Sequence, residues 1–203
     1  MNSNPTTALF SFMKAQVPAG KLDSNSRSQI LSAHRYVSPR GHALTHKQSE
    51  IRRIAYALKI PTPESVETAA RAMAPLLIAA EKAPTPIVLI PVPTSTGSIE
   101  PNRQLANEIA AEIQRQQPAR RIQVQIMVGR KHPVESSCIR RKRGRRGLRP
   151  DQHAMIRVAN PTDTGNTAFY LVDNVATTGS TIFACRAALG FGRGIVWADK
   201  QKT

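Results

Sequence analysis

The sequence predicts an α/β fold, a mainly parallel sheet flanked by helices, with a helical extension on its N-terminal side. Strand-like and helix-like patterns alternate from residue 86 to residue 203, and parallel strands need such helices as connections. Two short runs, 87–92 and 169–172, are continuously apolar, which is typical of strands buried on both faces. We therefore expect one α/β domain over residues 86–203.

The preceding residues have a different character. Residues 1–46 are basic and rich in Ser, Asn, Thr and Pro, so we expect a loosely structured extension there. Residues 47–85 are predicted to be a helical segment. Its first helix, over residues 48–59, would bury a stripe of apolar side chains, namely Ile51, Ile54, Ala55 and Leu58.

A second helix is expected from Thr62 to about Lys82. Threonine followed by proline is a typical helix start, because threonine caps the first turn and proline tolerates the first helical position. Pro75 would kink this helix. Its inward stripe would consist of Val66, Ala70, Met73 and Leu77.

The α/β region begins with the strand 87–92, which is followed by a loop of small residues and by a helix whose apolar residues lie four apart, Leu105, Ile109 and Ile113. Alternation over 122–128 predicts a half-buried strand. A last helix is expected to begin within 177–181 and to end near Gly190, a suitable C-terminal cap. The remaining strands are expected at 155–158, 169–172 and 194–199.

Composition narrows the class of protein. Apolar residues make up 40% of the 203, which is enough for a hydrophobic core. No apolar run reaches the length of a membrane helix, and the first residues do not resemble a secretory signal. Two cysteines, Cys138 and Cys185, form neither a disulfide scaffold nor a zinc motif. We expect a reduced, cytoplasmic protein without a membrane partner.

The positive charge is concentrated in one segment. The net charge is +16, and residues 130–149 hold nine Lys or Arg residues against one carboxylate, Glu135. Such a run attracts nucleic acid or a highly phosphorylated small molecule, or it is a solvated loop without a defined partner. The run contains no Phe, Trp or Tyr, so binding of single strands by base stacking is poorly supported.

The residues that suggest chemistry follow the strand 169–172. This strand delivers Asp173 to the carboxyl end of the sheet, where open α/β sheets bind ligands. The next residues, 177–181, are Thr-Thr-Gly-Ser-Thr and lead into a helix, so several main-chain N–H groups and hydroxyls can surround a phosphate. The segment is no ATPase phosphate loop, because no lysine follows Gly179.

The segment 169–181 resembles the phosphoribosyl pyrophosphate signature of type I phosphoribosyltransferases. Twelve of its thirteen positions agree with that pattern, and Asn174 is the exception. The strand and loop over 90–98 resemble the part that receives the pyrophosphate. The spacing resembles amidophosphoribosyltransferase-like proteins of the competence-protein F type. Residues 1–85 show no such likeness.

The resemblance implies a Mg²⁺-dependent transfer of the phosphoribosyl group to a nitrogen acceptor, with release of pyrophosphate and with Mg²⁺ bound mainly through the substrate. It also implies a homodimer. The basic stretch 130–153 stands where the family has a flexible loop that closes over the pyrophosphate. The implied sugar-phosphate ligands are Asp173, Asn174, Ala176, Thr177, Thr178, Gly179, Ser180 and Thr181. The implied pyrophosphate ligands are Thr94, Ser95, Thr96, Gly97, Arg140 and Arg141.

Two positions depart from the family. Asn174 stands where the second acid is expected, and a neutral amide accepts a weaker hydrogen bond than a carboxylate. Thr177 stands where purine-salvage members have an aspartate, which disfavours activity on hypoxanthine or guanine.

Other interpretations stay open. The same fold, weakened as a catalyst by Asn174, would sense phosphoribosyl pyrophosphate or a nucleotide and bind nucleic acid through residues 130–149 and the basic N-terminal part. A further alternative is an effector that depletes phosphoribosyl pyrophosphate or modifies nucleotides. His42 and His46 are four apart, but no further metal ligands lie near them in the sequence, so we interpret them as surface residues. We assign no role to His132 and His153, and no general base is identified.

Overall fold

The computed structural model describes residues 29–38, 43–82, 85–161 and 165–200. Five parallel strands form one sheet in the order β1-β7-β6-β2-β3. Their bounds are Ile30–Arg35 (β1), Ile87–Pro91 (β2), Ile122–Val124 (β3), Ala168–Ala176 (β6) and Arg193–Asp199 (β7). The predicted α/β architecture with a parallel sheet is therefore confirmed.

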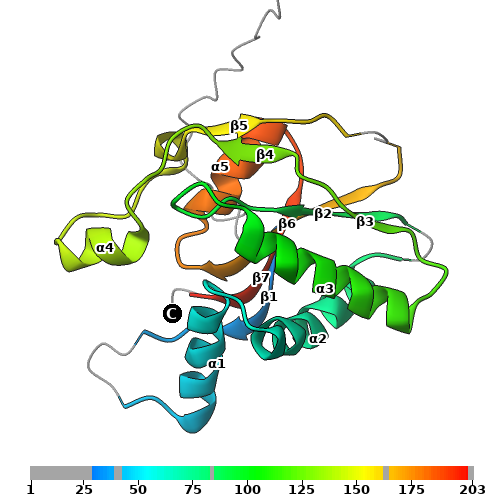
Figure 1. Cartoon of the computed structure of the whole chain (residues 1–203), viewed down its shortest axis with the longest axis horizontal. Coiled ribbons are helices and arrows are strands. Elements are labelled where there is room, and N and C mark those ends of the chain that lie inside the picture. Colours follow the sequence, from blue (N-terminus) through cyan, green and yellow to red (C-terminus); the bar gives the residue numbers. More distant parts are fainter. Residues whose placement is uncertain (1–28, 39–42, 83–84, 162–164, 201–203) are drawn as a thin grey trace, which may run out of the picture.

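Helices cover both faces of this sheet (Figure 1). Three of them, α1 (His46–Ala57), α2 (Pro63–Ala80) and α3 (Glu100–Gln116), pack on one face. The other face carries α5 (Ser180–Leu189) and a small antiparallel sheet of β4 (Val128–Arg130) and β5 (Met155–Arg157). The short helices α4 (Ser137–Lys142) and η2 (Pro150–His153) lie between β4 and β5 in the chain. None of the helices in the described ranges is long and apolar enough to cross a bilayer.

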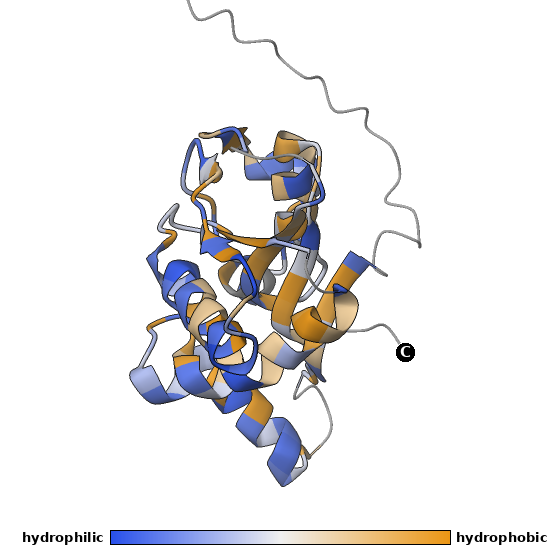
Figure 2. Ribbon diagram, turned by 90° about the vertical axis from the view of Figure 1, so that its right-hand side faces the viewer, coloured by the Kyte–Doolittle hydropathy of each residue, from blue (hydrophilic) through white to orange (hydrophobic). Residues whose placement is uncertain are grey.

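The core explains why the central strands are apolar without interruption. Leu89 and Val172 pack toward the three-helix side, whereas Ile90 and Leu171 pack toward α5. Both sides of these strands are therefore buried, as the sequence predicted. Figure 2 shows hydrophobic colours gathered on the strands and much hydrophilic colour on α1 and α3. The helical stripes expected in α1 and α2 are buried as predicted: Ile51, Ile54, Ala55, Leu58, Val66, Ala70, Met73 and Leu77.

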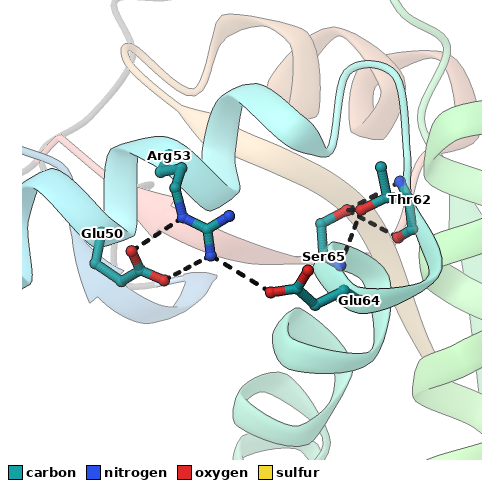
Figure 3. A network of polar contacts seen from close by, with 5 residues as sticks. All are labelled: Glu50, Arg53, Thr62, Glu64 and Ser65. Carbon is teal, nitrogen blue, oxygen red and sulfur yellow. Dashed lines mark hydrogen bonds and ion pairs between the residues drawn. The ribbon is translucent and has the colours of Figure 1, made fainter.

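The junction between α1 and α2 is set by local polar contacts (Figure 3). Thr62 Oγ1 accepts a hydrogen bond from the N–H of Ser65 at 3.3 Å, and Ser65 Oγ accepts one from the N–H of Thr62 at 3.1 Å. Arg53 pairs with Glu50 at 2.8 Å and with Glu64 at 3.6 Å. The reciprocal cap confirms the predicted helix start and ends the preceding loop at a defined residue.

One strand was not predicted. Residues 30–35 lie in the segment expected to be a loosely structured extension, yet they form β1 and pair in parallel with β7 from Ile30 to Arg35. The sequence ILSAHR shows neither a continuous apolar run nor strict alternation, because an edge strand is only partly covered. Residues 1–28 and 39–42 of the predicted extension lie outside the described residues.

Two other predictions need correction. The strand expected over 122–128 is two strands, because the chain leaves β2 after Gln125 and Val128 joins the small sheet. Strand β6 extends beyond residue 172 to Ala176, because pairing with β7 continues there, so Asp173 lies within the strand. The basic stretch 130–153 contains the short helices α4 and η2, and its role as a flexible loop stays a prediction.

Candidate functional site

A cavity of about 630 Å³ lies at the carboxyl edge of the sheet. Strands β2 and β6 pair side by side, so the loops that follow them meet at this edge. The cavity brings together most of the residues that the sequence singled out. They are Asp173, Asn174, Ala176, Thr177, Thr178, Gly179, Ser180, Thr181, Thr94, Ser95 and Thr96.

Three of the singled-out residues are not part of the cavity wall as described. Gly97 has φ +96° and closes the tight loop in which its N–H bonds Thr94 O at 3.1 Å. Arg140 turns to its own segment, where its Nε donates to Arg146 O at 2.8 Å. The side chain of Arg141 lies outside the described residues, as does that of His42.

The turn over residues 177–181 depends on Gly179. This residue begins α5 with φ +74°, a conformation that favours glycine. A Cβ atom there would lie 2.6 Å from the Phe183 ring and 3.1 Å from Ile30, so no side chain fits. The N–H of Ser180 bonds Thr178 Oγ1 at 3.3 Å. The positive end of α5 and its first-turn N–H groups therefore face a wall rich in hydroxyls, which suits an anion.

Asp173 lies deep in the cavity with its carboxylate already held. Its Oδ1 accepts from the N–H of Asn174 at 2.8 Å and from Asn102 Nδ2 at 3.3 Å. Burial raises the pKa of Asp173 to about 6, against the opposing effects of these two hydrogen bonds and of Arg130. The side chain still contacts the open cavity, so its second oxygen is in position to accept hydrogen bonds from a hydroxyl-bearing ligand.

Asn102 and Asn174 shape the surroundings of this carboxylate. Asn102 is buried on α3 and also donates to Val92 O at 2.7 Å, so it ties α3 to the ends of β2 and β6. Asn102 was not predicted to belong to the site, because nothing in its local pattern distinguishes it from other polar helix residues. Asn174 accepts from the N–H of Val175 at 2.8 Å through its Oδ1, which orients its side chain.

Arg130 joins three parts of the cavity wall and was not singled out from the basic run. Its Nε donates to Thr94 O at 2.9 Å, and its Nη1 donates to His153 O at 2.7 Å. Burial lowers the pKa of Arg130, but arginine starts so high that the group stays charged. Burial and the Arg130 charge lower the pKa of His153 to about 4, so this imidazole is neutral at pH 7.

The first residues of the basic run 130–149 are bonded to the cavity wall, whereas three of its arginines pair with one acid, Glu135. The N–H of Val134 bonds Ser95 O at 2.8 Å. Glu135, which also lines the cavity, pairs with Arg143 at 2.6 Å, with Arg145 at 3.5 Å and with Arg140 at 3.7 Å. The charged lining residues are two carboxylates, Asp173 and Glu135, and two cations, Lys59 and Arg130. The suitability of the cavity for an anion therefore depends on Arg130 and on the hydroxyl-rich start of α5.

In the described part of the chain, no group of three His, Cys, Asp or Glu residues is arranged to hold a metal ion. Comparison with protein-family models and with curated proteins gave no match. The function therefore has to be inferred from the chemistry of this cavity.

Proposed function

We propose that the protein binds phosphoribosyl pyrophosphate and transfers its phosphoribosyl group to a nitrogen acceptor, releasing pyrophosphate. The observation that carries this proposal is the meeting of three features in one cavity. Asp173 lies at its bottom, the Gly179 turn begins α5 at one wall, and the loop 94–98 forms another. Each feature suits a different part of a phosphorylated sugar. Two of them, Asp173 and the Gly179 turn, belong to the segment 169–181, which resembles the phosphoribosyl pyrophosphate signature.

In this proposal the 5-phosphate binds the main-chain N–H groups and hydroxyls of residues 177–181. The ribose hydroxyls donate to the Asp173 carboxylate, whose orientation is fixed by Asn102 and the N–H of Asn174. The pyrophosphate lies toward Thr94 and Arg130, which a 2.9 Å hydrogen bond holds together. A fixed guanidinium in a partly buried place interacts more strongly with an anion than a mobile surface arginine does.

The reaction is a displacement at the sugar C1. The acceptor nitrogen forms a bond to C1 while the bond from C1 to the pyrophosphate oxygen breaks, and pyrophosphate leaves with the electron pair. Arg130 would stabilise the charge that develops on the leaving group, because its orientation needs no change during the step. The cavity walls would hold both reactants in line and exclude water, which raises the effective concentration of the acceptor.

Mg²⁺ fits this site as a companion of the substrate. Asp173 offers one hard oxygen ligand, and Mg²⁺ commonly combines one or two carboxylates with substrate phosphates and water. The ion would partly neutralise the pyrophosphate. Thr94, Arg130 and the N–H groups around them supply the contacts that come from the protein.

The alternative function, a sensing module that binds nucleic acid, has one observation in its favour. Figure 1 shows α4 standing apart from the layers of the fold, and residues 142–147 around its end are exposed. Exposed cations bind nucleic-acid phosphates without reading the sequence. Release of pyrophosphate with Mg²⁺ over a panel of amines and nitrogen bases separates the two functions, since the module would bind without turnover.

Calorimetry with phosphoribosyl pyrophosphate and Mg²⁺ tests the complex that the enzyme needs. We expect saturable binding by the wild type and loss of at least about tenfold in affinity for Gly179→Val, because the added side chain displaces the turn. Gly147→Val is the matched control, since a Cβ there meets nothing within 4 Å. Asn174→Asp should strengthen binding, because a charged acceptor contributes about 1.5–3 kcal/mol against about 1 for a neutral one.

Circular dichroism and thermal melting establish that each variant is folded before its affinity is compared. A wild type that gives no binding heat contradicts the proposed function. An unchanged affinity in folded Asn174→Asp contradicts the role of that position alone.

A further inference from the structure

Tyr36, Tyr56 and Lys59 line the same cavity and have no part in the binding described so far. Arg52 is not itself a lining residue, but it interacts with both tyrosines. Tyr36 directly follows β1, and its N–H bonds Asp199 O at 2.8 Å, which places it at the carboxyl edge of the sheet. Tyr56 and Lys59 lie at the end of α1 and also line the cavity, with Arg52 one turn before Tyr56. We call Tyr36, Arg52, Tyr56 and Lys59 the tyrosine wall.

The tyrosine wall combines aromatic faces with positive charge. Lys59 Nζ lies 4.9 Å from the centre of the Tyr56 ring, and the guanidinium carbon of Arg52 lies 5.8 Å from it. The pKa of Tyr56 is lowered, chiefly by hydrogen bonding with Arg52. Tyr56 remains 49% exposed, which is high for a large aromatic residue. An exposed ring accompanied by two cations at the wall of a cavity is suited to contact with a flat anion.

The cations of the tyrosine wall have no carboxylate partner in the part of the chain that the structure describes. The acidic residues nearby are already engaged, because Arg53 takes both Glu50 and Glu64 on another side of α1 (Figure 3). The groups that act on Arg52 are the two tyrosines, and its Nε is buried without a hydrogen-bond partner among the described residues. No carboxylate of the described residues neutralises the Arg52 guanidinium, so its charge is available to attract an anionic ligand beside the two tyrosines.

We propose that the tyrosine wall is the acceptor subsite and that it takes a planar aromatic or heteroaromatic carboxylate whose nitrogen is the nucleophile. The ring would stack against Tyr56 and Tyr36, and the carboxylate would bind Arg52 and Lys59. This inference rests on the proposed transfer reaction. The nitrogen forms its bond to C1, pyrophosphate departs with the electrons of the broken bond, and any proton on that nitrogen passes to water.

The dimensions of the cavity agree with two ligands. Pockets that hold small molecules usually measure about 300–1,000 Å³. The cavity of about 630 Å³ extends from Tyr36, Tyr56 and Lys59 to the Gly179 turn. A neutral base would leave Arg52 and Lys59 without an anion, so the wall selects for the carboxylate as well as for the ring.

The test compares two non-reactive probes, benzoate and benzamide, which share a ring and differ in charge. Their affinities are measured by NMR titration of the full chain with phosphoribosyl pyrophosphate and Mg²⁺ present. We expect benzoate to bind the wild type about tenfold more tightly than benzamide, Arg52→Gln to reduce that preference, and Arg52→Gln combined with Lys59→Gln to abolish it. Tyr56→Leu should weaken both probes. Arg53→Gln, which removes the neighbouring cation that faces Glu50 and Glu64, is the matched control and should change neither.

The outcomes separate this inference from the proposed function. Equal affinities for the two probes, or an unchanged preference in folded Arg52→Gln, overturn the inference while phosphoribosyl pyrophosphate still binds. If the wild type prefers benzoate but does not bind phosphoribosyl pyrophosphate, the anion subsite stands and the proposed transfer reaction fails. The comparison of probes on the wild type requires no variant to fold.

Discussion

Asp173 illustrates the conflict between stability and binding at the scale of a single residue. Its carboxylate is placed where burial opposes ionisation, and two hydrogen bonds only partly compensate. The pKa of about 6 lies above the ordinary value of 3.8. The folded chain therefore keeps this proton to a higher pH than the unfolded chain does. A sugar that donates hydroxyl hydrogen bonds to the ionised group would recover part of the cost.

This pKa predicts a pH-dependent difference between the wild type and Asp173→Asn. Because the folded-state pKa is raised, the free energy of unfolding contributed by Asp173 falls as pH rises from about 4 to about 6. The free energy of unfolding of the variant does not fall in this way. Relative to the wild type, it should therefore rise by on the order of 1–3 kcal/mol between pH 4 and pH 6. Urea unfolding at pH 4 to 8 measures the difference, and a difference that does not vary with pH contradicts the assignment.

The site was predictable where its residues adjoin in sequence. Residues 173–181 could be singled out because a strand, an acid, a glycine and a run of hydroxyls follow one another. Arg130, His153 and Asn102 could not, because their roles arise from contacts across 36, 23 and 71 positions of the chain. Tyr36 and Tyr56 could not be singled out for the same reason, because they come together only when β1 joins the sheet.

At the scale of elements, a polar cluster fixes the end of the sheet opposite the cavity. Tyr170 on β6 donates to Glu81 Oε1 at 2.5 Å, and Arg193 on β7 donates to Tyr170 Oη at 3.0 Å and to Glu81 at 3.1 Å. Glu81 is the C-cap residue of α2. Three elements are thus joined through one buried hydroxyl, whose pKa is raised by burial and by Glu81.

Tyr170→Phe should lower the free energy of unfolding by about 1–2 kcal/mol, because it removes the hydroxyl and leaves Glu81 and Arg193 with one partner fewer. Affinity for phosphoribosyl pyrophosphate should stay within about twofold, since the cluster lies away from the cavity. Denaturant titration provides the stability measurement. Tyr56→Phe, at an exposed ring, should cost less than about 0.5 kcal/mol, and an equal loss in both variants contradicts the role of the cluster.

The elements differ in how well their patterns predicted them. Helix α2 was predictable because Thr62 and Pro63 mark its start and its apolar stripe is complete. Strand β1 was not, because its pairing with β7 rather than its own composition makes it a strand. The alternation over 122–128 specifies an extended chain but not its partner, so the change from the main sheet to β4 could not be seen.

At the scale of the whole molecule, half of the net charge of +16 lies in residues 130–149, where Arg130 belongs to the cavity wall and other cations belong to an exposed segment. Lys142 and Arg146 are exposed and form no ion pair within the described ranges, in contrast to Arg143 and Arg145, which share Glu135. The exposed charges of Lys142 and Arg146 attract any polyanion at low salt, whereas Arg130 is held in the cavity wall by its hydrogen bonds.

Lys142→Gln combined with Arg146→Gln should therefore separate the two anion-binding properties. We expect the slope of log affinity for duplex DNA against log salt to become less steep by about two, because two phosphate contacts are lost. Binding of phosphoribosyl pyrophosphate should change less than about twofold. Fluorescence anisotropy at several salt concentrations and calorimetry measure the two. If the double variant instead loses its affinity for phosphoribosyl pyrophosphate, these two cations belong to the cavity site.

The position of β1 in the sheet decides how far the chain can be shortened. A protein trimmed to residues 86–203 would keep every residue of the signature and would still lack an outer strand, two helices and the Tyr36 side of the cavity. Its β7 would offer unpaired main-chain groups beside uncovered apolar surface, the combination that promotes association between chains. The smallest piece worth expressing therefore starts ahead of Ile30.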